Sequence, residues 1–229
     1  MPVTVRHLLL AGFVSLFILN ACKQDTEAPR ETVTVEPLSM VDTVLDDIPL
    51  GQLPSEVIPL AYQLELTIVP ELEEFSGRTV IDIEFAASKN HFYLHGKNLE
   101  PGKVQLTSGN RTFDVVYEQV DKSGIVRISS PEPLQGKVQL VIEYSAPFNQ
   151  SLEGLYKVSE SGNHYAYTQF EAISARLAFP GFDEPGFKTP FTTTLIVPEN
   201  HVAISNTPEL SSKINNGMKV VRFAPTKPL

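Results

Sequence analysis

From about residue 53 onward the sequence alternates apolar and polar residues with a period of two, and this pattern restricts the fold to β-structure. Tyr62, Leu64, Leu66 and Ile68 alternate with polar residues at positions 63, 65 and 67. Successive side chains of a strand point to opposite faces of a sheet, so this segment is predicted to be a half-buried strand. Similar strand-like segments follow at residues 79–85, 92–94, 112–117, 125–129 and 138–144.

Turn-forming residues separate these segments and help to define the fold class. Glycine, asparagine, serine and proline cluster at residues 108–110, 123–124, 131–133, 161–163 and 216–217. The pair Asn216-Gly217 suits a tight hairpin turn. No segment keeps a helical period of 3.6 residues over three turns. The pattern therefore predicts an all-β domain over residues 53–229, an antiparallel β-sandwich or a related fold.

The first 21 residues have the organisation of a secretory signal peptide. Arg6 and His7 precede an apolar run from Leu8 to Leu19. A run of this length is too short to cross a bilayer as a helix, which needs about 20 residues. A charged start, a short apolar run and small residues are typical of a cleaved secretory signal.

The single cysteine, Cys22, follows this run directly. Positions 19–22 have the sequence Leu-Asn-Ala-Cys and resemble the bacterial lipobox, in which the cysteine is lipidated and becomes the new N-terminus. Lys23 stands where an inner-membrane retention signal has Asp, which favours an outer-membrane lipoprotein that faces the periplasm of a bacterial cell envelope. The alternative is a plain secretory peptide with a chance cysteine.

Residues 22–52 are predicted to be an acidic, flexible tether behind the lipidated cysteine. Residues 23–47 contain seven acidic and two basic side chains, few large apolar residues and no period. The whole chain has 18 Lys and Arg against 27 Asp and Glu, a net charge of −9. A nucleic-acid-binding protein needs a basic face to displace counterions from phosphates, so no nucleic-acid partner is expected.

The sequence contains no recognisable metal site or catalytic set. None of the five histidines begins a His-Glu-x-x-His zinc motif. His91 and His95 are four residues apart in a β-patterned segment, where this spacing is about 13 Å and too long for one tetrahedral ion. No Ser/His/Asp set is recognisable either. We therefore expect neither catalytic residues nor a cofactor in this chain.

The most unusual segment is residues 164–191, HYAYTQFEAISARLAFPGFDEPGFKTPF. As a strand it would place Tyr165, Tyr167, Gln169 and Glu171 on one face. A carboxylate beside an amide is a natural receptor for a positively charged amine, although the pattern alone favours an ordinary solvated strand face. Farther along, Arg176 is predicted to pair with one of the two acidic residues at positions 183 and 184, and the phenylalanines at 179 and 182 are predicted to anchor the turns.

The central motif resembles the aminopeptidase N-like zinc metallopeptidases, a family that includes leukotriene hydrolase. It comprises residues 168–172 (TQFEA), Ala175 and Arg176, residues 178–180 (AFP), 182–185 (FDEP), and Phe187 and Lys188. Flanking matches at residues 59–64, 94–99 and 202–206 extend the resemblance over roughly residues 55–225. The chain departs from the family pattern at Gly181, where many members have Cys, and at Leu177, where a second Arg is common.

The resemblance implies a saddle-like or sandwich-like N-terminal β domain that packs against a thermolysin-like catalytic domain. In the family, the residue matching Glu171 binds the free α-amine of the substrate, and the residue matching Gln169 lines the same pocket. Peptide N-termini and the catalytic domain are thus the implied partners, together with a membrane reached through the lipid anchor. The family's zinc ligands follow this domain, so residues 53–229 are expected to be a nearly complete, C-terminally truncated domain that is inactive alone.

Three hypotheses of function follow. The first is the N-terminal domain of a secreted, lipid-anchored zinc aminopeptidase, which removes N-terminal residues from peptides. The second is a non-catalytic lipoprotein that uses the β domain to bind peptides or another protein. The third is an unrelated sandwich, for example a carbohydrate-binding domain.

Overall fold

The computed structural model describes residues 48–229, and nearly all of their regular structure is β-strand. The strands are, in chain order, β1 (Val57–Thr67), β2 (Glu74–His95), β3 (Glu100–Ser108), β4 (Arg111–Asp114), β5 (Val116–Gln119), β6 (Ile125–Pro147), β7 (Gly154–Glu160), β8 (Asn163–Gln169), β9 (Phe191–Pro198), β10 (Glu209–Asn215) and β11 (Met218–Phe223). In this range the one helical segment is the 3-10 helix η1 (Ala175–Leu177). The all-β fold class is confirmed, whereas the predicted signal peptide and Cys22 lie outside the described residues.

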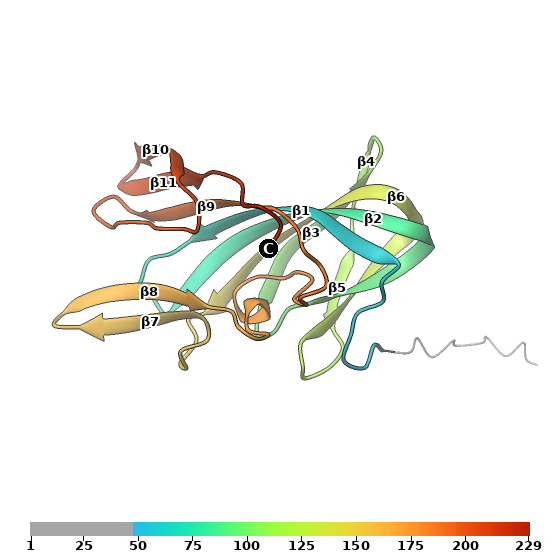
Figure 1. Cartoon of the computed structure of the whole chain (residues 1–229), viewed down its shortest axis with the longest axis horizontal. Helices are drawn as coiled ribbons and strands as arrows, with labels where there is room; N and C mark the ends of the chain where they lie inside the picture. Colours follow the sequence, from blue (N-terminus) through green and yellow to red (C-terminus); the bar gives the residue numbers. More distant parts are fainter. Residues whose placement is uncertain (1–47) are drawn as a thin grey trace, which may run out of the picture. The chain divides into compact units, whose positions relative to one another are not determined.

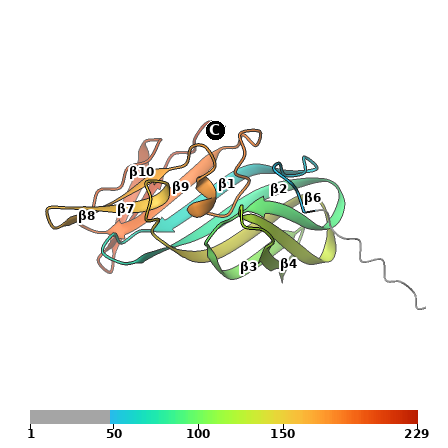
Figure 2. The ribbon, with the colours of Figure 1, turned by 90° about the horizontal axis from the view of Figure 1, so that it is seen from below.

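Nine strands form one large sheet in the order β10-β11-β9-β1-β2-β6-β3-β4, and β5 pairs with β6. Strands β1 and β9 run parallel, while the other paired neighbours are antiparallel. Strands β7 and β8 form a separate hairpin beside the large sheet (Figure 1 and Figure 2). The sheet is therefore mixed and mostly antiparallel, and the chain between β1 and β9 is the long connection that a parallel pair requires.

The period-two pattern predicts correctly which side chains of β1 and β6 are buried. The buried members are Tyr62, Leu64, Leu66, Val138, Leu140, Ile142 and Tyr144. Between them stand more exposed residues such as Gln63, Glu65 and Glu143. Removal of these apolar side chains from water stabilises the sheet by about 25 cal/mol per Å² of buried apolar surface.

Two pairs of predicted strands are joined into single long strands. Segments 79–85 and 92–94 both lie in the 22-residue β2, and segments 125–129 and 138–144 both lie in the 23-residue β6. The turn predicted at residues 131–133 is instead a break in the ladder, where the β2–β6 register shifts on both sides of Lys89. Pro131 and Pro133 fall in this irregular stretch, which accommodates residues that cannot donate a ladder hydrogen bond.

Two turn-related predictions have different outcomes. The strand predicted at residues 112–117 is two strands, because β4 pairs with β3 whereas β5 pairs with β6. Between them Val115 donates its N–H to the carbonyl of Val104 at 3.1 Å. Asn216 and Gly217 connect β10 and β11 with φ values of 50° and 75°, which confirms the predicted tight hairpin turn.

A buried ion pair holds the chain between β8 and β9 on the sheet. Arg176 Nε donates to Asp183 Oδ2 at 2.8 Å, with the two side chains 8% and 13% exposed. The other guanidinium nitrogens donate to the backbone carbonyls of Ser123 and Asp183, both at 3.1 Å. Of the two predicted partners, Arg176 therefore pairs with Asp183, and these further hydrogen bonds compensate for the removal of both charges from water.

His95, the last residue of β2, connects this segment to the sheet as a neutral group. Its backbone exchanges two hydrogen bonds with Gly181, of 2.7 and 2.8 Å, and its Nδ1 accepts the N–H of Asp183 at 3.2 Å. Burial, and then the positive charge of Arg176, lower the pKa of His95 to about 4. The ring is therefore neutral at pH 7, and its 3.9 Å approach to Glu184 is not an ion pair there.

Two buried tyrosine hydroxyls complete the attachment. Tyr62 Oη accepts the N–H of Phe182 at 2.8 Å, and Tyr144 Oη donates to the carbonyl of Ala178 at 3.0 Å. Burial raises the pKa of both hydroxyls above the usual tyrosine range. Phe179 and Phe182 are themselves buried, which confirms their predicted role as anchors of the turns.

Replacing Gly77 by alanine should loosen this attachment. Gly77 pairs with Tyr144 across β2 and β6, and a Cβ at position 77 would lie 2.3 Å from Tyr144 Oη. The ring would have to move away from Ala178, so we expect the free energy of unfolding to fall by about 1–3 kcal/mol in a denaturant titration. Gly102→Ala is the matched control, because a Cβ there meets nothing closer than 3.4 Å. Equal losses in the two variants would contradict the prediction.

The neutral state of His95 predicts a dependence of stability on pH. The ring titrates near pH 6.5 when unfolded and near pH 4 when folded, so the unfolded chain binds more protons between these values. The free energy of unfolding should therefore fall as the pH falls through this window, by at most about 3 kcal/mol in total.

The variant His95→Asn isolates this contribution. Its amide oxygen can accept the N–H of Asp183 in place of Nδ1, but the side chain does not titrate. Denaturant titrations at several pH values should give a shallower slope for the variant between pH 6.5 and 5, where most carboxylates remain ionised. Parallel slopes for the variant and the native chain would show that His95 is not the group responsible.

Candidate functional site

Gln169 is the last residue of β8 and lies on the face of the hairpin that points away from the core. On the opposite face Leu155 is buried and Ala166 packs against the core. From that face Lys157 Nζ also donates to Glu73 at 2.8 Å. Gln169 is exposed, and its side chain makes no hydrogen bond with a residue in the range 48–229.

Glu171 lies beyond the end of β8, so the predicted continuation of the strand to this residue is wrong. The ladder ends because Gln169 pairs with Gly154, the first residue of β7, and β7 offers no partner farther on. Phe170 then directs its ring to Phe179, with 5.7 Å between centroids. Residues 171–174 form a turn, and the peptide bond between Glu171 and Ala172 is cis.

The carboxylate of Glu171 is exposed and has no hydrogen-bond or ion-pair partner among the described residues. Arg176 is the nearest Lys or Arg in sequence, but it forms an ion pair with Asp183 and so does not neutralise the charge of Glu171. The turn that carries Glu171 is fixed by the hydrogen bond from the N–H of Ser174 to the carbonyl of Phe170, at 2.8 Å. The result is an accessible negative charge on a well-anchored segment, two residues from an exposed amide.

This pair of groups has a defined chemical capability. A carboxylate accepts charge-assisted hydrogen bonds from an ammonium group, and the amide of Gln169 can both donate and accept. The chemistry is that of a receptor for a primary amine with a neighbouring polar group.

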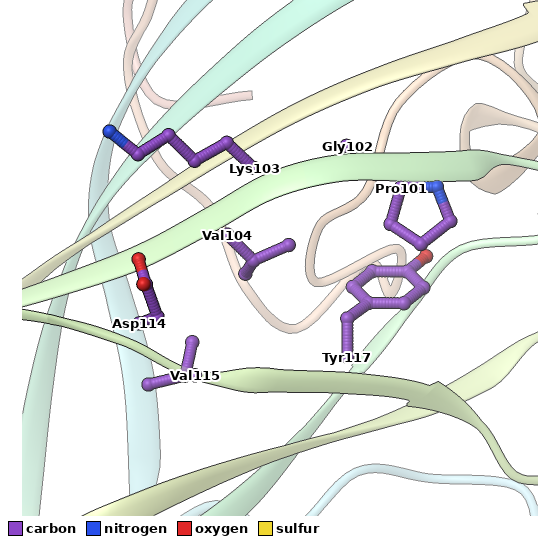
Figure 3. Close-up of a pocket in the computed structure, with 7 residues that line it drawn as sticks. All are labelled: Pro101, Gly102, Lys103, Val104, Asp114, Val115 and Tyr117. Carbon is purple, nitrogen blue, oxygen red and sulfur yellow. The ribbon is translucent and has the colours of Figure 1, made fainter.

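A separate pocket of about 370 Å³ lies between β3 and the β4–β5 segment (Figure 3). Its lining residues are Pro101, Gly102, Lys103, Val104, Asp114, Val115 and Tyr117. Asp114 is engaged by Gln105, whose Nε2 donates to it at 3.0 Å. None of the lining residues belongs to β8 or to the turn after it. We therefore place the candidate site at Gln169 and Glu171 rather than in this pocket.

The described residues do not supply a site for the zinc ion that the resemblance implies. In the range 48–229 no group of three or more His, Cys, Asp or Glu side chains is arranged to hold a metal ion. The buried histidine of this range, His95, does not fit the role of a metal ligand, because its Nδ1 already accepts the N–H of Asp183. No helix in this part of the chain is long and apolar enough to span a membrane.

Sequence reasoning missed the residues that position the site from a distance. Tyr62 and His95 lie in the flanking matches at residues 59–64 and 94–99, and Tyr144 lies in the strand predicted at 138–144, but neither signal indicated what their side chains would bind. Their hydrogen bonds to residues 178, 182 and 183 join parts of the chain that are 34 to 120 residues apart. The family-like motif at residues 175–176, 178–180 and 182–185 marked the segment that they hold.

Comparison with known proteins agrees with this architecture. The family described as Peptidase M1 N-terminal domain matches residues 58–229. The chain is 32% identical to Aminopeptidase M1-A of Oryza sativa subsp. japonica over 77% of its length, 30% identical to Aminopeptidase N of Acetobacter pasteurianus over 77%, and 30% identical to Endoplasmic reticulum aminopeptidase 1 of Homo sapiens over 70%. It spans 21%, 51% and 18% of these relatives, respectively. The chain belongs to the M1 aminopeptidase family and contains its N-terminal domain.

Proposed function

We propose that this chain supplies the substrate-amine anchor of a secreted, lipid-anchored zinc aminopeptidase. The observation that carries the proposal is the exposed carboxylate of Glu171, which has no partner among the described residues and lies on a turn attached to the sheet by buried groups. The protonated α-amine of a peptide is the cation that an aminopeptidase must locate. The names of the relatives, which are aminopeptidases, support this choice of ligand.

A fixed carboxylate explains how such a site would select the end of a peptide. Only an N-terminus presents an α-ammonium group, and an acetylated or internal amide does not offer this charge. An ion pair between the amine and Glu171 would set the position of the first peptide bond relative to the rest of the enzyme. Gln169, whose side chain is also exposed and unpartnered in the described range, would provide a polar contact to the first residue.

The hydrolytic step is assigned to a catalytic domain and not to the described residues. When bound, zinc would polarise the scissile carbonyl and its water, but residues 48–229 do not form a metal site. The role proposed for this chain is to bind and orient the peptide. Its other partner would be the zinc-binding domain of the same enzyme.

Loss of the negative charge at position 171 should abolish the preference for a free amine. For the peptide amide Ala-Ala-Ala, we expect Glu171→Gln to weaken binding to the chain at least about tenfold, because a charge-assisted hydrogen bond is lost. Titration calorimetry, or chemical-shift titration where affinity is low, would measure the change. The N-acetylated peptide should bind weakly and equally to both proteins.

Glu209→Gln provides the matched control, since Glu209 is also an exposed carboxylate but begins the distant edge strand β10. This variant should bind the free peptide like the native chain. If Glu171→Gln binds as tightly as Glu209→Gln, or if acetylation has no effect on the native chain, the amine-anchor function is wrong.

We also propose that Cys22 carries the lipid that attaches the protein to the outer membrane, facing the periplasm. Support comes from the lipobox-like sequence at positions 19–22 and from Lys23 after it. Expressed in bacteria, the native chain should incorporate labelled palmitate and sediment with outer membranes. Cys22→Ser should lose the label and leave the membrane fraction. A native chain that is unlabelled and soluble in the periplasm would instead indicate a plain secretory signal.

A further inference from the structure

A row of three tyrosines lies on the same face of the β7–β8 hairpin as Gln169. Tyr165 and Tyr167 precede Gln169 at two-residue intervals, and Tyr156 of β7 pairs with Tyr167 across the ladder. The ring centroids of Tyr156 and Tyr167 are 5.9 Å apart, and those of Tyr165 and Tyr167 are 6.4 Å apart. We call these three residues the tyrosine row.

The hairpin is attached to the domain through the face opposite the tyrosine row. Attachment is made by the other face, where Leu155 is 1% exposed and Lys157 Nζ donates to Glu73 and to the carbonyl of Leu72. Tyr165 and Tyr167, by contrast, remain 44% and 51% exposed. Aromatic rings with little conformational freedom and open faces are well suited to contact a ligand.

The tyrosine row is continuous with the proposed amine anchor. Figure 1 shows the hairpin running from the η1 end, where Gln169 and the turn lie, out to a tip formed by residues 160–163. Two-residue steps along a strand are about 6.6 Å, so Tyr165 lies about 13 Å from Gln169 along β8. An extended peptide advances by about 3.3 Å per residue and would need about four residues to cover this distance.

We infer that the tyrosine row binds the residues of an extended peptide that follow its N-terminus, an inference that rests on the proposed amine anchor at Glu171. The row's face bears no cation, and its far end carries the exposed carboxylate of Glu160. It therefore fits peptides of four or more residues with aromatic, apolar or basic side chains, which can stack on the rings or form cation–π contacts. Acidic peptides are disfavoured.

Two probes separate the row from the anchor: the dipeptide amide Ala-Ala and the hexapeptide amide Ala-Ala-Arg-Phe-Arg-Phe. The hexapeptide presents a guanidinium or a ring on either face and is long enough to reach Tyr165, whereas the dipeptide is not. We expect the double variant Tyr165→Thr/Tyr167→Thr to weaken hexapeptide binding about tenfold and to change dipeptide binding less than about twofold. Threonine keeps the β-branched character that favours a strand.

The controls make the two hypotheses distinguishable. Leu210→Thr, at an exposed apolar position of β10, should leave both peptides unaffected, and Glu171→Gln should weaken both. Unchanged hexapeptide affinity in the double tyrosine variant would assign the row to another partner and overturn this inference alone. Hexapeptide binding that depends on the tyrosines but not on Glu171 would overturn the amine anchor, and absence of hexapeptide binding to the native chain would overturn both.

A measurement on the native chain covers the case in which the double variant fails to fold. The ring proton signals of Tyr165 and Tyr167 should shift when the hexapeptide is added and stay in place with the dipeptide. Shifts confined to other tyrosines, such as the buried Tyr62 and Tyr144, would contradict the inference.

Discussion

The buried ion pair between Arg176 and Asp183 is the interaction on which the candidate site depends. Taking two charges out of water is costly, and the cost is offset here only because each group has several partners. The guanidinium also donates to two backbone carbonyls, and the backbone of Asp183 donates to His95. The pair therefore closes the chain between β8 and β9 onto the end of β2. It also removes the nearest cation in sequence from Glu171, whose carboxylate is left accessible.

Two tyrosine hydroxyls of the sheet supply the rest of the support. Polar groups like these are buried at low cost only when they have hydrogen-bond partners. Tyr62 from β1 and Tyr144 from β6 direct their hydroxyls at backbone atoms of Phe182 and Ala178. Each hydroxyl thereby gains a hydrogen-bond partner and satisfies one of the backbone groups of a segment that has little regular structure. The same residues present their rings to the core, so the packing of the sheet and the position of the turn are mechanically linked.

The period-two pattern predicted which residues of β1, β6 and β8 share a face, because side-chain alternation is a local property of an extended chain. It could not predict that β2 and β6 each continue through an irregular stretch, since that depends on how the two strands pair around Lys89. It also placed Glu171 on the strand, although the ladder stops at Gln169 for want of a partner in β7. The family resemblance implied both site residues, and its flanking matches included Tyr62 and His95. The hydrogen bonds that these two side chains make to Phe182 and Asp183 are long-range, so the sequence pattern did not indicate them.

The position of Glu171 just outside the strand matters for the function proposed here. A carboxylate within β8 would stand beside cross-strand neighbours of β7 and share their surface, as Gln169 and the tyrosines do. After the strand ends, the chain can present a single charge beyond the hairpin while the neutral face of β8 continues away from it. The carboxylates of Glu171 and Glu160 thus stand at opposite ends of this face, with the aromatic surface between them. In that arrangement an N-terminal ammonium would fix the register of a peptide, and the hairpin would contact the residues that follow without specifying their order.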